Sequence, residues 1–357
     1  MGARLRMVLD QLVHVVDQDQ ARASIDLARG LVRTAPSGCA VDAIVCASSE
    51  VTVEGIGEVR TLGLARRELA ASWQLGIAPG VGGGLIHSAS LMAPLVRHDR
   101  VHDNDQTTVT LWGLDAWDAP AESSKSNIAW HKAMLRRAVK HADAVVVPTH
   151  EIARRLSEIA KLGERIRVIA GAAPEGFAIP VDAAERRAAL GLPDRYVVLT
   201  GTASSLAEGF RGAIAADAHA VVLDAPEGAE PRLVELAASA GLPEQRAHIR
   251  GALDPDDRAA VLAGATALAA TSPVAAWPWR VIEAMHLGVP IVAIDGGAHR
   301  DVLADGGMLV AADEFADAVA HASSEGARRL SVLAADRAKA FSWASSAERV
   351  WALHAEL

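Results

Sequence analysis

The chain alternates short runs of β-branched and other apolar residues with longer stretches of helical periodicity, and this alternation restricts the fold more than any other feature. The run VDAIVCAS at residues 41–48 indicates a buried strand. Residues 20–34 place Ile25, Ala28 and Leu31 at helical spacing. Strands and helices that alternate at this rhythm form parallel sheets with helices on both faces.

The same pattern continues to the end of the chain. After a first strand near the N-terminus, strands are predicted at residues 41–48, 107–112, 143–149, 165–172, 196–204, 218–226, 247–253, 266–272 and 289–295. Helices are predicted at 20–34, 127–142, 230–241 and 256–265, with two more in 335–357 separated by a kink near Phe341. A segment rich in proline, glycine and alanine, 174–194, is typical of a crossing between domains. We therefore expect an α/β protein with two Rossmann-like doubly wound domains, since 357 residues exceed what one core usually serves.

Composition excludes several classes of protein. The chain is 51% hydrophobic and 22% charged, which is typical of a globular protein, and no apolar run approaches the roughly 20 residues of a membrane span. The net charge of −9 argues against a nucleic-acid partner. Cys39 and Cys46 fit neither a metal site nor a disulfide scaffold. These features favour a cytoplasmic protein whose N-terminus is a strand and not a signal peptide.

One helix leaves a second location open. Around Met134 the predicted helix carries several basic residues, namely His131, Lys132, Arg136, Arg137 and Lys140. Such a helix either keeps a solvated polar face or lies against the anionic inner face of the cell membrane as a peripheral contact.

Several segments together resemble one known family. They are IHSASLMAPL at 86–95, the helix–strand–helix at 129–159, VIEAMHLGVPIVAIDGGAHRDVLADGGMLV at 281–310 and FSWASSAERVWALH at 341–354. They are similar to retaining GT-B glycosyltransferases of family 4, in particular actinobacterial mannosyltransferase-like members.

The resemblance implies an acceptor-side Rossmann-like domain at 1–175 and a nucleotide-sugar-side domain at 176–335, which face each other across a cleft. It also implies that a helix at 336–357 returns to the first domain, with Val350, Leu353 and Leu357 on the contacting face. The implied reaction moves a hexose, mannose-like, from a nucleotide sugar to a glycan or glycolipid of the cell-envelope polysaccharide type, with retention. No metal ion and no other cofactor is expected.

The first domain departs from the family at two positions that carry chemistry. Where a glycine-rich loop should follow the first strand, the chain has Asp17-Gln18-Asp19-Gln20, in which Asp19 is interpreted as a helix N-cap. Where a histidine and an aspartate should stand near the reacting sugar, the chain has Trp112 and Gly113, and an indole cannot transfer a proton. The triplet Asp103-Asn104-Asp105 is interpreted as a solvated turn and not as a metal motif.

The second domain departs at two more positions. The basic pair that should neutralise the donor diphosphate falls on Leu206-Ala207 or Ala207-Glu208. The first of two glutamates that should lie eight positions apart is Ala275, and only the second, Glu283, is present. Trp277 and Trp279 could fill the emptied pocket.

The remaining candidates for donor binding are Glu283, Gly201, Arg211, Gly296 and Gly297. Glu283 either accepts hydrogen bonds from ribose hydroxyls or stabilises the first turn of its helix through the helix dipole. Arg211 either replaces the missing cations or is a solvated helix residue. The turn Gly296-Gly297 before a helix could offer backbone amides to a phosphate. No catalytic residue is assigned.

Two functions remain as alternatives. The chain is a hexosyltransferase by resemblance, whose nucleotide-sugar binding is weak or absent, or it is a pseudo-glycosyltransferase that serves as binding or scaffolding partner of an active glycosyltransferase. Eight tryptophans, interpreted as exposed interface residues, favour the second alternative. A dinucleotide-dependent oxidoreductase has little support, because no G-x-G-x-x-G follows a strand and opens a helix.

Overall fold

The computed structural model describes residues 2–357, which form two compact units. Unit 1 comprises Met1–Pro174 and Phe341–Leu357, and unit 2 comprises Glu175–Ala340. The chain therefore re-enters unit 1 at Phe341 and not at residue 336, because the helix α13 (Ala327–Ala338) packs on helix α10 (Trp279–His286) of unit 2.

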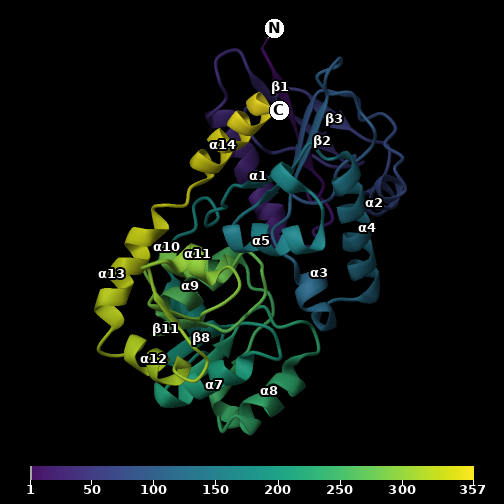
Figure 1. Cartoon of the computed structure of the whole chain (residues 1–357). Helices are drawn as coiled ribbons and strands as arrows, with labels where there is room; N and C mark the ends of the chain where they lie inside the picture. The colour runs from purple at the N-terminus through teal and green to yellow at the C-terminus, as the bar shows by residue number, and fades with distance from the viewer. Residues whose placement is uncertain (1) are drawn as a thin grey trace. The chain divides into compact units, whose positions relative to one another are not determined.

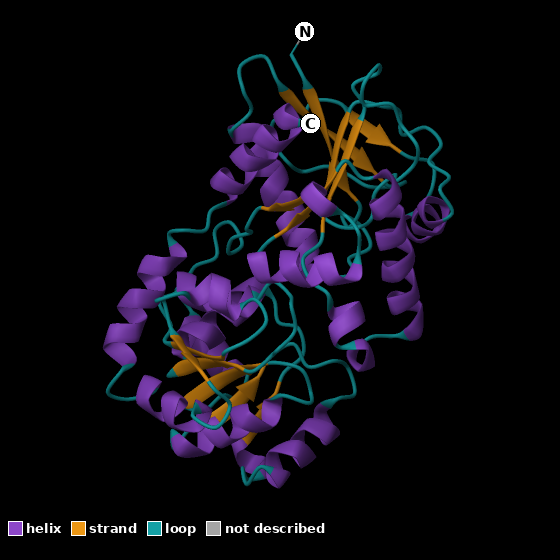
Figure 2. Ribbon diagram, viewed as in Figure 1, coloured by secondary structure: helices purple, strands orange, loops and turns teal. Residues whose placement is uncertain are grey.

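Unit 1 is built on a seven-stranded parallel sheet in the order β3-β2-β1-β4-β5-β6-β7 (Figures 1 and 2). Its strands are β1 (Arg4–Leu9), β2 (Ala40–Val45), β3 (Val59–Thr61), β4 (Leu85–Ser88), β5 (Gln106–Thr110), β6 (Ala144–Val147) and β7 (Ile166–Val168). The order of strands reverses between β1 and β4, and in open α/β sheets ligands bind beyond the carboxyl ends of the strands at such a point. The sequence pattern did not predict β3 or β4.

Helices cover both faces of this sheet (Figure 2). They are α1 (Gln18–Arg33), α2 (Arg66–Gln74), α3 (Asp115–Asp118), α4 (Lys125–His141), α5 (His150–Ile159) and α14 (Trp343–Glu356), with short 3₁₀ turns at Pro120–Glu122 and Gly163–Arg165. The N-cap of α1 is Asp17 and not Asp19, since the Asp17 carboxylate accepts the backbone N–H of Gln20 at 2.9 Å. Asp19 lies within the first turn.

This correction can be tested by a matched pair of substitutions. Asp17→Ala removes the cap and should lower the free energy of unfolding by about 0.5–2 kcal/mol. Asp19→Ala removes a first-turn carboxylate and should have a smaller effect, of about 0.3–1 kcal/mol. Chemical denaturation of both variants measures the difference. A larger loss for Asp19→Ala would place the cap at Asp19 after all.

The C-terminal helix α14 packs along α1 (Figure 1). Val350 and Leu353 are 1% and 3% exposed, while Leu357 is only half-buried. The indole of Trp351 donates to the carbonyl of Leu31 at 3.0 Å. A glycine is needed at Gly30, because a Cβ there would lie 2.7 Å from the carbonyl oxygen of Trp343. This close approach joins the last helix to the first.

Unit 2 repeats the architecture with six parallel strands in the order β10-β9-β8-β11-β12-β13. The strands are β8 (Tyr196–Thr200), β9 (His219–Val222), β10 (Ala247–Ile249), β11 (Ala267–Ala270), β12 (Ile291–Ile294) and β13 (Met308–Val310). The helices are α6 (Ala183–Ala189), α7 (Leu206–Ala215), α8 (Glu230–Ser239), α9 (Pro255–Gly264), α10 (Trp279–His286), α11 (His299–Leu303), α12 (Phe315–Ala322) and α13, with a 3₁₀ turn at Glu244–Arg246. The strand order reverses between β8 and β11.

The central strands of unit 2 are buried on both faces. Val197, Val198 and Leu199 in β8 have no exposed surface, as expected for parallel strands with helices on both sides. The loops that leave β8 and β11 therefore start from rigid positions. Among the described residues, no helix combines the length and apolarity that crossing a membrane requires.

Candidate functional site

The switch point of unit 2 brings together the loops after β8 and β11. A glycine is required at Gly201, because a Cβ there would lie 2.2 Å from the Thr271 hydroxyl and 2.7 Å from the Ser205 hydroxyl. The Ser205 and Thr271 hydroxyls lie 3.0 Å apart, and Thr202 bonds to Ser205 at 3.1 Å. The hydroxyl groups at this edge thus bond to one another, and Gly201 serves close packing.

Glu283, the main donor-site candidate, is 1% exposed on α10. Arg258 on α9 donates to both of its carboxylate oxygens, with Nε at 2.9 Å from Oε2 and Nη2 at 2.8 Å from Oε1. Arg280, one turn earlier on α10, donates from Nη1 to Oε2 at 2.7 Å. Both oxygens of the carboxylate are therefore occupied by charged donors.

The two arginines are held by further contacts within unit 2. Arg280 Nε donates to Asp224 Oδ2 at 2.7 Å, and Arg258 Nη1 donates to the carbonyl of Leu253 at 3.1 Å. The Arg258 guanidinium also lies 5.7 Å from the centre of the Phe177 ring, in a cation–π contact. The two arginines, Glu283 and Asp224 form a network with a formal charge of zero.

The sequence pattern missed both partners of Glu283. Arg280 stands three residues before Glu283 on the same helix, a spacing that allows an ion pair and could have been noticed. Arg258 comes from a different helix, 25 residues earlier, and only the packing of α9 against α10 brings it near.

Arg211 is also engaged. It lies exposed on α7 and forms a two-pronged ion pair with Glu208, three residues earlier on the helix. The carboxylate at Glu208 therefore compensates the cation nearest to the loop after β8.

The glycine turn Gly296-Gly297 follows β12, and its two residues differ. Gly297 has a φ of +53°, and a Cβ there would lie 2.5 Å from the carbonyl oxygen of Val274. No atom would crowd a Cβ at Gly296. Arg300 closes the turn through a two-pronged ion pair with Asp295. The requirement for glycine at Gly297 is thus explained by chain packing, while Gly296 faces open space.

The loop between β11 and α10, in which Ala275 stands where a glutamate was expected, is closely packed. Ala275 and Trp277 are 4% and 3% exposed, and Trp279 is half-buried. The two indoles meet edge to face with centres 6.3 Å apart. All eight tryptophans lie in the described part of the chain, and none is exposed. The interpretation of the tryptophans as exposed interface residues is wrong, because five of them are buried and the other three, Trp117, Trp130 and Trp279, are half-buried.

In unit 1, Trp112 has a packing role. It is 6% exposed, its indole N–H donates to the carbonyl of Ala89 at 2.7 Å, and its ring meets Trp343 edge to face. The indole thus joins the loops after β4 and β5 to the start of α14. No proton-transferring group replaces it at this position, since Gly113 follows.

A cavity of about 840 Å³ lies at the switch point of unit 1. Its polar lining includes Gln11, Asp17, Ser90, Asn127 and His131. Burial raises the pKa of Asp17, even though backbone and side-chain hydrogen bonds from Gln20 favour its ionised form. Ser90 lies in the segment 86–95 and Asp17 stands where the glycine-rich loop was expected, but only the fold brings these two residues together with Asn127 and His131. The cavity offers amide, hydroxyl, imidazole and carboxyl groups, which are the groups that hydrogen-bond sugars.

The triplet Asp103-Asn104-Asp105 forms a turn in which Asn104 adopts a φ of +55°. Asp105 accepts the backbone N–H of Gly84. Across residues 2–357, no three His, Cys, Asp or Glu side chains are grouped so that they could hold a metal ion.

Comparisons with known proteins agree with this geometry. Residues 206–325 match the family model of glycosyl transferases group 1. No curated protein matches the chain in sequence. Sucrose-phosphate synthase from Thermosynechococcus elongatus has a similar structure, with a TM-score of 0.67 and 19% identity over 99% of this chain and 98% of that chain.

Two further solved structures show the same likeness. HepE from Anabaena, in complex with UDP and glucose, has a TM-score of 0.66 and 18% identity over all of both chains. WaaG, a glycosyltransferase involved in lipopolysaccharide biosynthesis, has a TM-score of 0.62 and 12% identity over 97% of this chain and 98% of that chain. The chain thus has the two-domain fold of GT-B glycosyltransferases, and the match to the group 1 glycosyl transferase model lies within its second unit.

Proposed function

We propose that this chain is a GT-B glycosyltransferase homologue that keeps a sugar-binding cavity in unit 1 and has lost the ordinary donor chemistry of unit 2. The state of Glu283 carries the proposal. A carboxylate that binds ribose or sugar hydroxyls needs a free oxygen lone pair directed at the ligand. Here two arginines occupy both oxygens, and the side chain is 2% exposed.

Opening this network for a ligand would be unfavourable. Breaking a buried ion pair by removing one partner typically costs about 3–5 kcal/mol, because a charge is left uncompensated. Hydrogen bonds to neutral sugar hydroxyls return only about 1.5–3 kcal/mol each. A ligand hydroxyl therefore competes poorly with Arg258 for the Glu283 carboxylate.

The diphosphate of a donor also lacks a partner in unit 2. Arg211 is paired with Glu208, and Arg300 is paired with Asp295. The Thr202, Ser204 and Ser205 hydroxyls bond among themselves. Because charge on the leaving diphosphate grows in the transition state, its stabilisation needs cations that are free to turn toward it.

The related activity is transfer of a hexose, mannose-like, from a nucleotide sugar to a glycan or glycolipid, with retention. HepE is described as a complex with UDP and glucose, and this supports a nucleotide sugar as the ancestral donor. With the donor chemistry lost, the chain would act as a binding partner of an active glycosyltransferase and present a sugar to it. We place it in the cytoplasm.

Contact with the inner face of the membrane would use the exposed cations of α4. Lys132, Arg136 and Lys140 are exposed, whereas Arg137 turns inward to the carbonyl of Leu95. The three exposed cations are spaced four residues apart and so form one stripe along α4, and the contact would use this stripe without Arg137.

Calorimetric titration with UDP-, GDP- and TDP-sugars, together with a transfer assay, tests the proposed loss of donor chemistry. Two missing charged partners weaken binding by about ten- to a hundredfold each. We expect little or no transfer by the purified chain. Ala275→Glu alone should not restore it, because Arg258 and Arg280 still hold Glu283.

Turnover by the wild-type chain alone with any of these donors would overturn the proposal. In that case Arg211→Ala would show whether Arg211 leaves Glu208 to replace the missing cations, and Arg328→Ala, an exposed arginine on α13, is the matched control.

An active hexosyltransferase remains the second candidate, and the cavity in unit 1 favours it. A volume of about 840 Å³ accommodates a sugar acceptor. Both candidates require this cavity to bind a glycan or glycolipid headgroup, and only the second requires turnover. Asn127→Ala should weaken glycan binding in both cases.

A further inference from the structure

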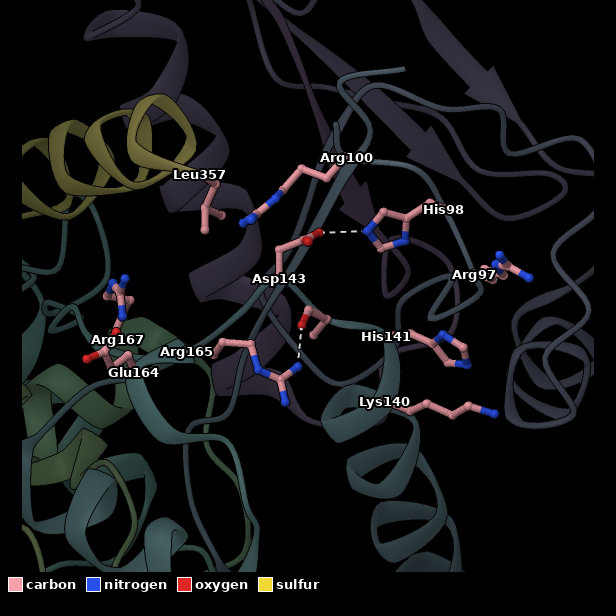
Figure 3. Close-up of a pocket in the computed structure, with 11 residues that line it drawn as sticks. Arg97, His98, Arg100, Lys140, His141, Asp143, Glu164, Arg165, Arg167 and Leu357 are labelled. Carbon is pink, nitrogen blue, oxygen red and sulfur yellow. Dashed lines mark hydrogen bonds and ion pairs between the residues drawn. The ribbon is translucent and has the colours of Figure 1, made fainter. Parts of the chain in front are cut away.

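A second cavity of unit 1 lies at the opposite edge of the sheet, at the amino ends of β5, β6 and β7. Its volume is about 490 Å³. Arg97, His98 and Arg100 come from the loop before β5, and Lys140 and His141 end α4. Asp143 precedes β6, while Glu164, Arg165 and Arg167 surround the start of β7. Figure 3 shows these side chains gathered around Asp143.

The cavity has the opposite charge to the protein as a whole. The whole chain has a formal net charge of −9. The lining contains five arginine or lysine side chains against two carboxylates, Asp143 and Glu164. Leu357 also lines the cavity, and a main-chain carboxylate there would leave five cations against three anions. The excess of positive charge is therefore built from three separate segments of the chain.

Part of this lining serves the fold. Arg165 donates to the carbonyls of Val139 and Ala142 at 2.8 Å each and so completes the C-terminal end of α4. Asp143 is occupied by the His98 imidazole at 2.7 Å and by the backbone N–H of Thr107 at 2.8 Å. The Asp143 hydrogen bond raises the pKa of His98, which favours its charged form.

Three other cations of the lining do not contribute to the fold through side-chain hydrogen bonds or ion pairs. Within the described chain, no hydrogen bond or ion pair is made by the side chains of Arg97, Arg100 or Lys140. In Figure 3, Arg97, Lys140 and His141 lie together on one side of the cavity, with no carboxylate drawn among them. Burial lowers the pKa of His141, and the charges of Arg137, Lys140 and His98 lower it further. This side of the cavity therefore carries an excess of positive charge, which the carboxylate of Asp99 offsets only in part through its interaction with Arg97.

We propose that this cavity binds a small phosphate-bearing anion with at least two negative charges, such as a pyrophosphate or a sugar phosphate. Guanidinium groups match the oxygens of a phosphate in a planar, two-pronged geometry, and the volume lies within the range of small-molecule sites. The binding groups are Arg97, Lys140 and His141, which lie on one side of the cavity, whereas Arg100 lies on the other side of Asp143 (Figure 3). The site is distinct from the switch-point cavity, because it lies at the amino ends of the strands.

Calorimetric titration of the full chain with inorganic pyrophosphate at low ionic strength tests the site. The double variant Arg97→Gln/Lys140→Gln should bind at least about tenfold more weakly, because two charged donors are lost. The matched control is Arg328→Gln/Arg329→Gln, which removes the same charge from exposed positions on α13 of unit 2 and should leave the affinity within about twofold. Near-ultraviolet circular dichroism checks that both double variants are folded.

Binding should also be coupled to proton uptake at pH values below the ordinary histidine pKa of about 6.5. An anion beside His141 stabilises the protonated ring and so opposes burial and the neighbouring cations, which lower its pKa, so the measured enthalpy should depend on the ionisation enthalpy of the buffer. His141→Gln should abolish most of this dependence.

Further ligands identify the source of the phosphate. Glucose 1-phosphate, citrate and vesicles of phosphatidylglycerol are titrated in parallel. Tighter binding of pyrophosphate or glucose 1-phosphate than of citrate supports the proposal. The absence of saturable pyrophosphate binding, binding to vesicles alone, equal affinity for citrate or an equal loss in the control variant would each overturn it. A nucleotide sugar that binds the Arg97→Gln/Lys140→Gln variant as well as the wild type binds elsewhere, so the failure of this site and of the proposed function are distinguishable.

Discussion

Replacing Glu283 by glutamine is expected to lower the free energy of unfolding of unit 2 by about 3–5 kcal/mol. The carboxylate lies between Arg258 and Arg280, whose side chains are only 6% and 8% exposed. Glutamine keeps nearly the same shape and loses the charge, so Arg258 remains buried without a compensating anion. A residue reserved for ligand hydroxyls would behave differently, since its replacement would weaken binding and leave stability almost unchanged.

The measurement is denaturant unfolding followed by hydrogen exchange in α9, α10 and β11, because the two units need not unfold in one step. Glu208→Gln is the matched control, since it breaks the exposed pair with Arg211 and should cost only about 0.2–1 kcal/mol. The double variant Glu283→Gln/Arg258→Gln should lose less than the sum of the single variants, because it leaves fewer unpaired charges. Equal effects of Glu283→Gln and Glu208→Gln would show that the network contributes little.

Unit 1 is expected to lose stability steeply as the pH falls from about 6.5 toward 4. Two histidines, His87 and His354, are 0% and 4% exposed and meet edge to face. Burial and, to a smaller extent, the neighbouring His354 lower the pKa of His87 to about 3. Burial likewise lowers the pKa of His354 to about 4, although the charge of Asp143 acts in the opposite direction.

The hydrogen bonds around these rings explain why both are neutral. His354 Nδ1 donates to Gln106 Oε1 at 2.8 Å, which leaves Nε2 to accept from the Thr108 hydroxyl at 3.1 Å. His87 Nδ1 then donates to Thr108 Oγ1 at 2.7 Å, and its Nε2 accepts from Thr110 at 3.3 Å. In each ring, Nδ1 donates one hydrogen bond and Nε2 accepts one from a threonine hydroxyl. A proton added to Nε2 would therefore point at a hydroxyl that already donates to it, which disfavours the charged form.

The sign of the pH effect follows from these pKa values. Below about pH 6.5 the histidines of the unfolded chain bind protons, whereas those of the folded chain stay neutral down to about pH 4 and pH 3. The unfolded state therefore binds more protons in this window, and the free energy of unfolding falls as the pH falls. At about 1.4 kcal/mol per pH unit for each histidine, the loss from pH 7 to pH 4.5 is on the order of 5 kcal/mol.

Unfolding of unit 1 across this pH range, monitored by hydrogen exchange in β5, measures the slope. His354→Gln keeps a donor and an acceptor on α14 and should remove about half of the slope, because one titrating group remains. His286→Gln, at an exposed position on α10, should leave the slope unchanged. A slope that His354→Gln does not alter would mean that other groups govern the acid sensitivity.

The sequence by itself determined the class of fold. Alternating apolar runs and helical spacing predicted parallel doubly wound sheets, because such strands are buried on both faces and must be β-branched or apolar along their whole length. It missed β3, β4 and β13 as separate strands, since glycines lie close to all three and interrupt the apolar pattern. It placed the α1 cap two residues late, because Asp17 and Asp19 are chemically equivalent as caps and only the backbone path selects between them.

Only the tertiary structure decided the state of the candidate site. Glu283 stood in a motif, but the motif does not show that Arg258 arrives from another helix to occupy its carboxylate. The sequence shows where the tryptophans stand, but whether an indole is buried depends on neighbours that are distant in the chain. The phosphate-binding cavity consists of short basic segments that the sheet brings to one edge. Secondary structure can be predicted from the local spacing of apolar residues, because this spacing follows backbone periodicity. Burial and ion pairing depend instead on which distant segments pack together.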